Sequence, residues 1–401
     1  MKTIATINKN FCCGCTACKT ICPTKAINMR EDKKGFLYPE VNTSICISCS
    51  LCLNTCYENT SEYRALPVLK SYAVKNKNPK VLKQSSSGGV SHALCHFVIE
   101  HGGVVYGVGY DEQFRVVTSR AQTIEDCDRF YGSKYVQTNL MNTFQEVFED
   151  IQCGKTVLYF ATSCHVGGLL SFLKVKQCNI ANLITVDFTC HGTPSPKLFS
   201  DYIDFLKMDS SFSCFEFRTK EKPWGYGSVN FGCTISYENG RKEVDTNKAR
   251  IFLNLFFSNN FLRPNCFQCR YSSPNKPADL TIMDFWGLKD ELPNLFDECG
   301  VSAVFTHTNK GQKLLKSAPE LEIWDCTVEQ ITKKQANLKK SPIKPPSYDK
   351  AWEIYETHGF RAVSYQWGNY SVYKRIKRLF KKLLNKPILN NIFALGNKFT
   401  L

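Results

Sequence analysis

The sequence contains no run of 18 uninterrupted apolar residues, the length that a membrane-spanning helix needs, so no membrane span is predicted. The opening segment MKTIATINKNFCC lacks the apolar stretch of a secretory signal, and we expect none. We therefore expect a cytoplasmic, thiol-reducing compartment. In that compartment closely spaced cysteines bind metal or act catalytically more often than they form disulfides.

Acidic residues are missing from the last segment, Val372–Leu401. This tail carries eight of the lysines and arginines, which leaves +7 of the net charge of +15 for residues 1–371. Its stretch VYKRIKRLFKKLLNK is apolar on one face and basic on the others, which predicts an amphipathic helix. The apolar face needs a surface: the inner face of a membrane as a peripheral contact, an acidic partner, or the protein's own core. Because the excess charge belongs to the tail, no nucleic-acid partner is predicted.

Cysteine is abundant in this sequence. Its 401 residues, 43% hydrophobic and 22% charged, are typical of a globular protein of two or three domains. Its 21 cysteines are too few for a small secreted disulfide scaffold and too many to ignore. Their spacing must indicate their use.

Two cysteine runs of the same C-x2-C-x2-C-x3-C spacing lie in the first sixty residues. FCCGCTACKTICP contains the first, and CISCSLCLNTC repeats it 34 residues later. This run is typical of ferredoxins with two [4Fe-4S] clusters, in which the fourth cysteine ligates the other cluster. Three cysteines on a tight loop reach three corners of one cluster, while the fourth points away. The alternative, a pair of zinc knuckles, needs only four ligands per site and no crossed pairing.

The crossed pairing assigns the eight cysteines to two clusters. Cluster one is predicted on Cys12, Cys15, Cys18 and Cys56. Cluster two is predicted on Cys46, Cys49, Cys52 and Cys22. Cys13 is left over, and we interpret it as a thiol beside the cluster.

The stretch from Gln84 predicts a loop, a helix and two strands. QSSSGGV is a serine- and glycine-rich turn, the apolar residues after it follow helical spacing as far as Gly102, and residues 104–110 and 114–119 alternate as strands. A glycine-rich turn at a helix N-terminus exposes N–H groups to an anion such as a flavin pyrophosphate. An ordinary turn with a helix cap explains the same residues.

From Thr156 onward apolar strands alternate with helices, which predicts a mainly parallel sheet. Cys164 and Cys190 each follow the carboxyl end of a strand, where neighbouring strands about 4.8 Å apart bring ligands together. Cys266 and Cys269 form a C-x2-C pair that needs two more ligands. We predict a third [4Fe-4S] centre on these four thiols, with zinc or unpaired core thiols as alternatives. The other cysteines lack such spacing and are expected to be small buried hydrophobes: Cys95, Cys127, Cys153, Cys178, Cys214, Cys233, Cys299 and Cys326.

Six segments resemble the beta subunits of coenzyme F420 hydrogenases and dehydrogenases, an iron-sulfur flavoprotein family. They lie within residues 84–310 and read SSSGGV, GSKYVQ, ATSCHVGGL, DFTCHGTPSP, LRPNCFQC and DLTIMDFWG. The resemblance implies an FAD-binding α/β domain with its own cluster behind a fused ferredoxin module, and supports the four ligands of the third centre. It implies flavin contacts from Ser87, Gly88, Gly89, Gly132, Ser133, Lys134 and Tyr135. The cation of Lys134 would stabilise an anionic reduced flavin, unless it is an ordinary solvated lysine.

The chain departs from the usual family pattern at ATSCH, where Ser163 and His165 flank the cysteine in place of proline and glutamine. His165 and His191 each follow a predicted ligand directly, and are candidates for relaying protons to a substrate or for hydrogen bonding beside the cluster.

DFWG (284–287) and KPWGYG (222–227) are candidate substrate-facing loops, and core packing explains them equally well.

The predicted fold is an α+β ferredoxin-like module followed by an α/β domain with a mainly parallel sheet and a basic amphipathic C-terminal helix. The expected divisions are a ferredoxin domain (1–60), a connector (61–83), the N-terminal (84–150) and C-terminal (151–330) regions shared with those beta subunits, and the tail (331–401).

The predicted function is that of an oxidoreductase which uses [4Fe-4S] clusters and FAD. It would exchange electrons between a ferredoxin-type or other redox donor and an organic substrate, and some relatives accompany polysaccharide assembly. An electron-transfer subunit without its own substrate is the competing hypothesis, and a zinc-stapled binding protein is a third.

Overall fold

The computed structural model describes residues 2–59, 65–208, 211–220, 224 and 232–370. The predicted amphipathic helix in the tail lies outside these residues. Among the helices described, none is both long and apolar enough to span a membrane.

The strands of the described residues are β1 Ile27–Glu31, β2 Leu37–Val41, β3 Lys70–Asn76, β4 Val104–Tyr110, β5 Val116–Ala121, β6 Val157–Phe160, β7 Leu183–Phe188, β8 Phe212–Thr219, β9 Gly232–Tyr237, β10 Lys242–Val244, β11 Leu280–Asp284, β12 Ser302–Thr306 and β13 Leu321–Cys326. The α-helices are α1 Ala17–Ile21, α2 Leu51–Thr55, α3 Pro79–Gln84, α4 Val90–Glu100, α5 Ile124–Asp128, α6 Thr143–Gln152, α7 Ser163–Val175, α8 Pro196–Lys207, α9 Ile251–Phe257, α10 Leu288–Glu291, α11 Asn309–Ser317, α12 Val328–Thr332 and α13 Tyr348–Gln366.

The central sheet has eight strands in the described part of the chain, in the order β13-β3-β12-β11-β7-β6-β4-β5. Only β11, β7, β6 and β4 pair in parallel, and every other pairing is antiparallel. The sheet is therefore mixed, and the expectation of a mainly parallel sheet was wrong outside its centre. On one flank, the strands β13, β3 and β12 come from segments before residue 84 and after residue 300, which sequence reasoning had not assigned to this sheet.

Helices cover both faces of the central sheet, which explains its nearly continuous apolar strands. On β6, Leu158 and Phe160 face the core under α4 and α11, while Val157 and Tyr159 face α6 and α7. This alternation follows the two-residue period of a strand. The carboxyl ends of β6 and β7 then lead directly into the segments that carry Cys164 and Cys190.

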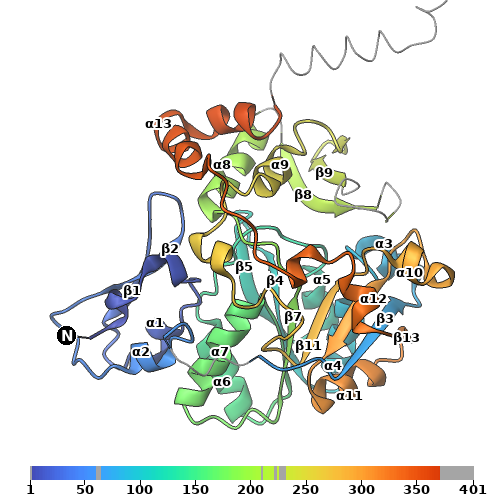
Figure 1. Cartoon of the computed structure of the whole chain (residues 1–401), viewed down its shortest axis with the longest axis horizontal. Coiled ribbons are helices and arrows are strands. Elements are labelled where there is room, and N and C mark those ends of the chain that lie inside the picture. Colours follow the sequence, from blue (N-terminus) through green and yellow to red (C-terminus); the bar gives the residue numbers. More distant parts are fainter. Residues whose placement is uncertain (1, 60–64, 209–210, 221–223, 225–231, 371–401) are drawn as a thin grey trace, which may run out of the picture.

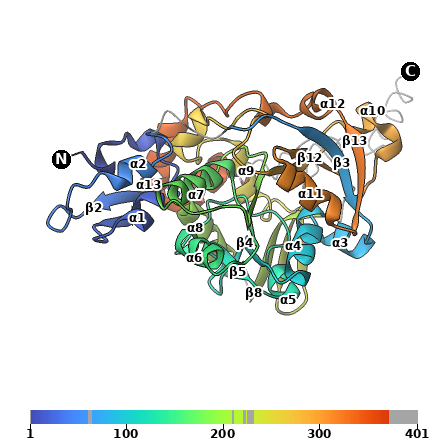
Figure 2. The same cartoon turned by 90° about the horizontal axis from the view of Figure 1, so that it is seen from below.

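The N-terminal module consists of the antiparallel β1–β2 hairpin and the short helices α1 and α2. Figures 1 and 2 show it beside α6 and α7, at one end of the sheet. Ala17 and Ile21 of α1 are buried in the same core as α6 and α7. The module is thus packed against the α/β body through apolar side chains.

A second sheet, which the sequence did not suggest, lies above the first. Strands β8, β9 and β10 form an antiparallel sheet, and Figure 1 shows it together with α8, α9 and α13. Its core is rich in aromatic rings, including Phe215, Phe217 and Phe252, and it extends to Phe36 of the N-terminal module. This unit therefore also holds the module in place.

Candidate functional site

The two cysteine loops of the N-terminal module have the same backbone shape. In the first loop Gly14 and Thr16 have φ values of 73° and 63°. Their counterparts 34 positions later, Ser48 and Ser50, have φ values of 56° and 59°. Such left-handed residues curl the chain so that successive cysteines turn toward one centre. A short helix then follows each loop and ends at the fourth cysteine, Cys22 or Cys56.

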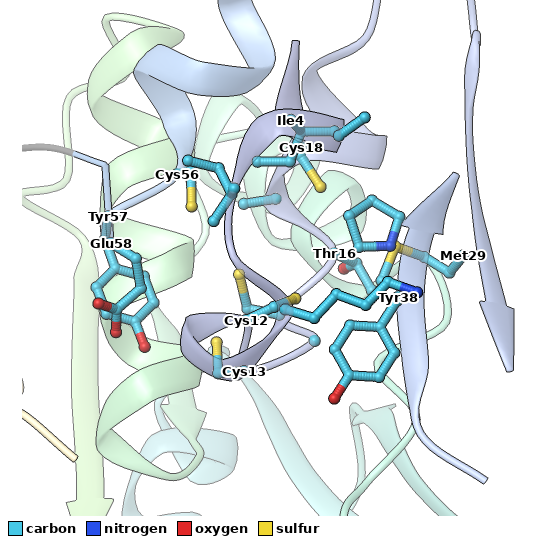
Figure 3. Close-up of a pocket in the computed structure, with 17 residues that line it drawn as sticks. Ile4, Cys12, Cys13, Thr16, Cys18, Met29, Tyr38, Cys56, Tyr57 and Glu58 are labelled. Carbon is cyan, nitrogen blue, oxygen red and sulfur yellow. The ribbon is translucent and has the colours of Figure 1, made fainter. Parts of the chain in front are cut away.

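Two pockets in the module collect the cysteines in the crossed manner. The first is lined by Cys12, Cys13, Cys15, Cys18 and Cys56, and the second by Cys22, Cys46, Cys49 and Cys52. Figure 3 shows the first pocket, with Tyr38 on one side and Tyr57 and Glu58 on the other. This donor set fits one [4Fe-4S] cluster per pocket, because each cluster takes four cysteine thiolates.

Burial shapes the chemistry of the thiols in the first pocket. It raises the pKa of Cys18 well above its ordinary value and raises the pKa of Cys56 to about 12. Only the thiolate binds metal, so loading this pocket must release protons. Gly168 of α7 makes room for Cys15, because a side chain at position 168 would come within 2.7 Å of its Sγ.

The four thiols predicted for a third centre come together at the carboxyl edge of β6 and β7. Cys164 lies in the first turn of α7, directly after β6, and Cys190 follows β7. Cys266 and Cys269 belong to a short 3₁₀ helix, Pro264–Gln268, and its C-terminal cap. Burial raises the pKa of Cys190 to about 12, and the neighbouring Cys266 and Cys269 contribute to this rise. The four residues offer the same all-thiolate donor set as the module.

Backbone hydrogen bonds join the two segments that carry these thiols. The N–H of Arg263 donates to the carbonyl of Thr193 over 2.9 Å, and the N–H of Thr193 reaches the Sγ of Cys266 over 3.4 Å. Gly192, with a φ of 137°, allows the approach, since a side chain there would contact Leu262 and Cys266. The segments DFTCHGTPSP and LRPNCFQC are therefore one structural unit.

Cys13 lies between the ligands predicted for cluster one and those predicted for the third centre. Its thiol is buried, and the thiols of Cys15 and Cys164 hydrogen-bond to it, which lowers the pKa of Cys13 well below its usual value. Its carbonyl accepts a 2.8 Å hydrogen bond from the side chain of Gln137. Cys13, interpreted above as a thiol beside one cluster, thus contacts predicted ligands of both sites.

Arg263 is a functional candidate that sequence reasoning missed. Its side chain is fully buried, and it donates to the carbonyl of Cys12 (2.7 Å), the carbonyl of Leu37 (2.8 Å) and the side-chain oxygen of Gln137 (3.0 Å). It also lies 3.6 Å from the Sγ of Cys12. Within the described residues the guanidinium has no carboxylate partner. The nearest groups that can carry a negative charge beside it include the cysteine sulfurs. Its place three residues before Cys266 was the available signal.

The two segments proposed to hold a flavin are hydrogen-bonded to each other. Ser133 donates from its N–H and its hydroxyl to the Oγ of Ser86, both over 2.9 Å. The N–H of Gly88 donates to Ser302 and the hydroxyl of Ser87 to the carbonyl of Val301. A side chain at Gly88 would collide with the backbone of β3 and β12.

Lys134 and Tyr135 face different neighbours. The ammonium of Lys134 donates to the carbonyls of Arg129 and Tyr131, and burial lowers the pKa of Lys134 to about 7. The ring of Tyr135 stacks on Phe256 and meets Phe217 edge-on. Burial raises the pKa of Tyr135, and a hydrogen bond to Arg218 lowers it in part.

An ion pair lies beside Tyr135. Arg218 forms two hydrogen bonds with Asp284, of 2.7 and 3.1 Å, and the indole N–H of Trp224 donates to the same carboxylate. The rings of Trp224 and Trp286 stack 5.5 Å apart. In the DFWG and KPWGYG segments, the described tryptophans therefore pack on each other around this ion pair. The rest of KPWGYG lies outside the described residues.

The two histidines proposed for catalysis differ in their surroundings. His165 is buried in α7 and hydrogen-bonds to the backbone of Cys13; burial lowers the pKa of His165. The ring nitrogens of His191 lie 2.7 Å from the side-chain oxygen of Asn259 and 3.3 Å from that of Asn337. Both ring nitrogens of His191 therefore have protein partners, whereas the buried Nδ1 of His165 has no hydrogen-bond partner among the described residues.

Comparisons with known proteins identify both parts of the chain. Residues 11–60 match the model of a 4Fe-4S dicluster domain. Residues 154–332 match the family model that describes the C terminus of the coenzyme F420 hydrogenase/dehydrogenase beta subunit.

Two proteins similar to this chain have names that mention F420. One is the protein of Methanosarcina mazei named as the F subunit of F(420)H(2) dehydrogenase. It is 25% identical over 159 residues, which cover 37% of this chain and 45% of that protein. A chain in the xenon-derivatised F420-reducing [NiFe] hydrogenase complex from Methanosarcina barkeri superposes with a TM-score of 0.46 at 16% identity, covering 75% of this chain and 91% of the other. Residues 154–332 of this chain are thus similar to the C-terminal region of coenzyme F420 hydrogenase/dehydrogenase beta subunits, and a 4Fe-4S dicluster domain precedes that region.

Proposed function

We propose that this protein is an iron-sulfur flavoprotein oxidoreductase that carries electrons from a redox donor through three cluster sites to FAD and an organic substrate. The observation that supports this most strongly is the position of Cys13. Its thiol contacts Cys15 on the cluster-one side and Cys164 on the side of the third centre. The two sites are therefore separated by a single side chain, a separation suited to electron transfer.

The exposed side of the module favours a donor that docks at the second pocket. Cys49 is exposed, and the neighbouring Ile45 and Ile47 are 47% and 63% exposed. Apolar residues at the surface beside a redox site suit a transient protein contact. We propose that a ferredoxin or another electron-transfer protein binds here, and that electrons leave the module through cluster one.

Arg263 and His165 lie in the buried region between cluster one and the proposed third centre, and we propose that the charge of Arg263 affects cluster one. Arg263 places a cation beside Cys12 and makes hydrogen bonds that fix its orientation. A nearby cation stabilises the more negative, reduced state of a cluster. His165 hydrogen-bonds to the Cys13 backbone in the same region, so we assign it a positioning role beside the clusters rather than a proton relay.

The SSSGG and GSKY segments support a flavin site. Their link through Ser86 and Ser133 holds the glycine-rich turn before α4 beside the segment that carries Lys134, an arrangement that suits the phosphates of FAD. Bound FAD would supply the exchange between one-electron and two-electron chemistry. The names of the relatives make coenzyme F420 one candidate substrate, and an organic compound of polysaccharide assembly is another.

A second function, that of an electron-transfer subunit without its own substrate, is favoured by the histidines. Both ring nitrogens of His191 lie against amide oxygens, and His165 is enclosed by protein. Neither histidine presents an open proton-transfer group to a substrate. Such a subunit would pass electrons to a larger redox complex, as the relatives' names suggest.

Anaerobic purification of the full chain tests these proposals. We expect about twelve iron atoms, four for each cluster, and one flavin per chain. About eight iron atoms without flavin would support the subunit without substrate and contradict the flavoprotein. Zinc in place of iron would contradict both. Reduction of the bound flavin by a reduced ferredoxin, followed by stopped-flow spectroscopy, then measures the proposed transfer directly.

A further inference from the structure

Two histidines and a glutamate form a cluster remote from the cysteine sites. His92 and His96 lie one turn apart on α4, and their rings are 3.8 Å apart between centroids. Glu320 precedes β13 and brings one carboxylate oxygen within 3.5 Å of the Nδ1 of His92 and the other within 3.4 Å of the Nδ1 of His96. The ligand atoms of the three residues all lie within 4.8 Å of one another.

Hydrogen bonding leaves part of this cluster unsatisfied. The Nδ1 of His92 and the Nε2 of His96 are buried and have no hydrogen-bond partner among the described residues. The imidazole-to-carboxylate distances of 3.4 and 3.5 Å exceed those of a good N–H···O bond. They are close to the spacing of ligand atoms around a tetrahedral ion, because bonds of about 2.0–2.2 Å place neighbouring ligand atoms roughly 3.3–3.6 Å apart.

The surroundings orient the carboxylate as metal sites require. The side-chain amide of Asn76, which is fully buried at the end of β3, donates to Glu320 over 3.2 Å. Such an outer hydrogen bond fixes a ligand's direction. The ring of Tyr131 lies 5.0 Å from that of His92 and covers one side. The side chains of His92, His96 and Glu320 are 9%, 18% and 32% exposed, so an ion could enter and keep one open position.

We propose that His92, His96 and Glu320 bind one divalent transition metal ion of the zinc class. Two imidazoles and a carboxylate match the borderline preference of Zn²⁺.

The bound ion would fasten α4 to the chain that enters β13. Helix α4 begins directly after the SSSGG segment, and Tyr131, which covers His92, precedes the GSKY segment. The site is therefore placed to hold both proposed flavin segments in position. This consequence rests on the proposed flavin site, whereas the metal site itself does not.

Cobalt titration of the full-length, cluster-loaded protein tests the site after a chelator has removed loosely bound metal. We expect one Co²⁺ per chain, with visible d–d bands and without the near-ultraviolet band of a cobalt-thiolate bond. His96→Ala should weaken binding at least tenfold, while His101→Ala, at the end of the same helix, should bind like wild type. Added Zn²⁺ should displace the cobalt and raise the melting temperature of wild type but not of His96→Ala.

Three results would overturn the proposal: no cobalt bound by wild type, equal binding by the His96 variant, or a thiolate band. If His96→Ala does not fold, Glu320→Gln preserves the size of the side chain and should give the same loss. Equal iron content and equal far-ultraviolet circular dichroism of wild type and variant establish that the fold is kept. Because the iron centres stay loaded throughout, failure of the flavin or electron-transfer proposals would leave this result unaffected.

Discussion

The thiols of the module and those of the third centre are assembled in different ways. In the module, each loop supplies three cysteines within seven residues, and left-handed residues at matching positions curl both loops alike. The proposed third centre draws Cys164, Cys190 and the Cys266–Cys269 pair from three separate segments, and hydrogen bonds around Thr193 join the last two of these. A local spacing therefore defines one kind of site, and a sheet edge defines the other.

The sharpest test of this contrast removes one thiol of the long-range site. In Cys266→Ser we expect iron to fall from about twelve to about eight atoms per chain, because the four-thiolate set is broken while the module's loops are unchanged. Iron analysis and electron paramagnetic resonance of the reduced protein measure this. The matched control is Cys153→Ser, an exposed cysteine outside all three sets. Unchanged iron in Cys266→Ser would refute the third centre.

The contact between the two sites should be sensitive to Arg263. Replacing it with methionine leaves the carbonyls of Cys12 and Leu37 without their donor, and we expect a loss of about 3 kcal/mol in unfolding free energy. Loss of the cation should also lower the reduction potential of cluster one by on the order of 60 mV. For a one-electron couple this is a tenfold change in the equilibrium constant for reduction of the cluster. Denaturant unfolding and a redox titration followed by electron paramagnetic resonance measure the two effects.

Two further variants control the Arg263 experiment. Arg263→Lys should recover most of the potential but not the stability, because it keeps the charge and loses the fork of donors. Arg270→Met removes a partly exposed partner of Glu58 and should change stability by less than about 1 kcal/mol. An Arg263→Met potential equal to wild type would exclude an electrostatic role for this residue.

The proposed flavin region should respond to pH through Lys134. Its pKa of about 7 means that the ammonium is charged below pH 7 and neutral above it. Affinity for the phosphates of FAD should therefore fall by roughly tenfold from pH 6.5 to pH 8.5 in wild type. Fluorescence titration with FAD should show a flat profile in Lys134→Met and a wild-type profile in Lys80→Met. A pH profile that is unchanged in Lys134→Met would remove this lysine from the flavin site.

The smallest expected effect concerns the link between the two flavin segments. Ser86→Ala deletes the acceptor of both hydrogen bonds from Ser133. We expect FAD affinity to fall about fivefold, corresponding to roughly 1 kcal/mol. Ser91→Ala, on the exposed face of α4, is the matched control. Equal affinities in the two variants would mean that the serine link does not shape the site.

The sequence predicted best those elements whose pattern lies within a single short segment. The helix from Val90, the strands from Val104 and Val116, and those from Val157 and Leu183 follow from apolar periodicity. The mixed character of the sheet was not visible, because β3, β12 and β13 pair with partners that no local pattern names. The aromatic unit around β8–β10 was missed for the same reason.

The sequence by itself determined that the chain binds iron through cysteine, because the spacing of thiols along a tight loop needs no distant partner to reach one cluster. It also located the strand ends that carry Cys164 and Cys190. Only the tertiary structure decided that Cys13 contacts predicted ligands of two sites, that Arg263 is buried against Cys12, and that His92 and His96 meet Glu320. Those contacts depend on how separate segments pack, and packing is set by long-range burial rather than by residue spacing.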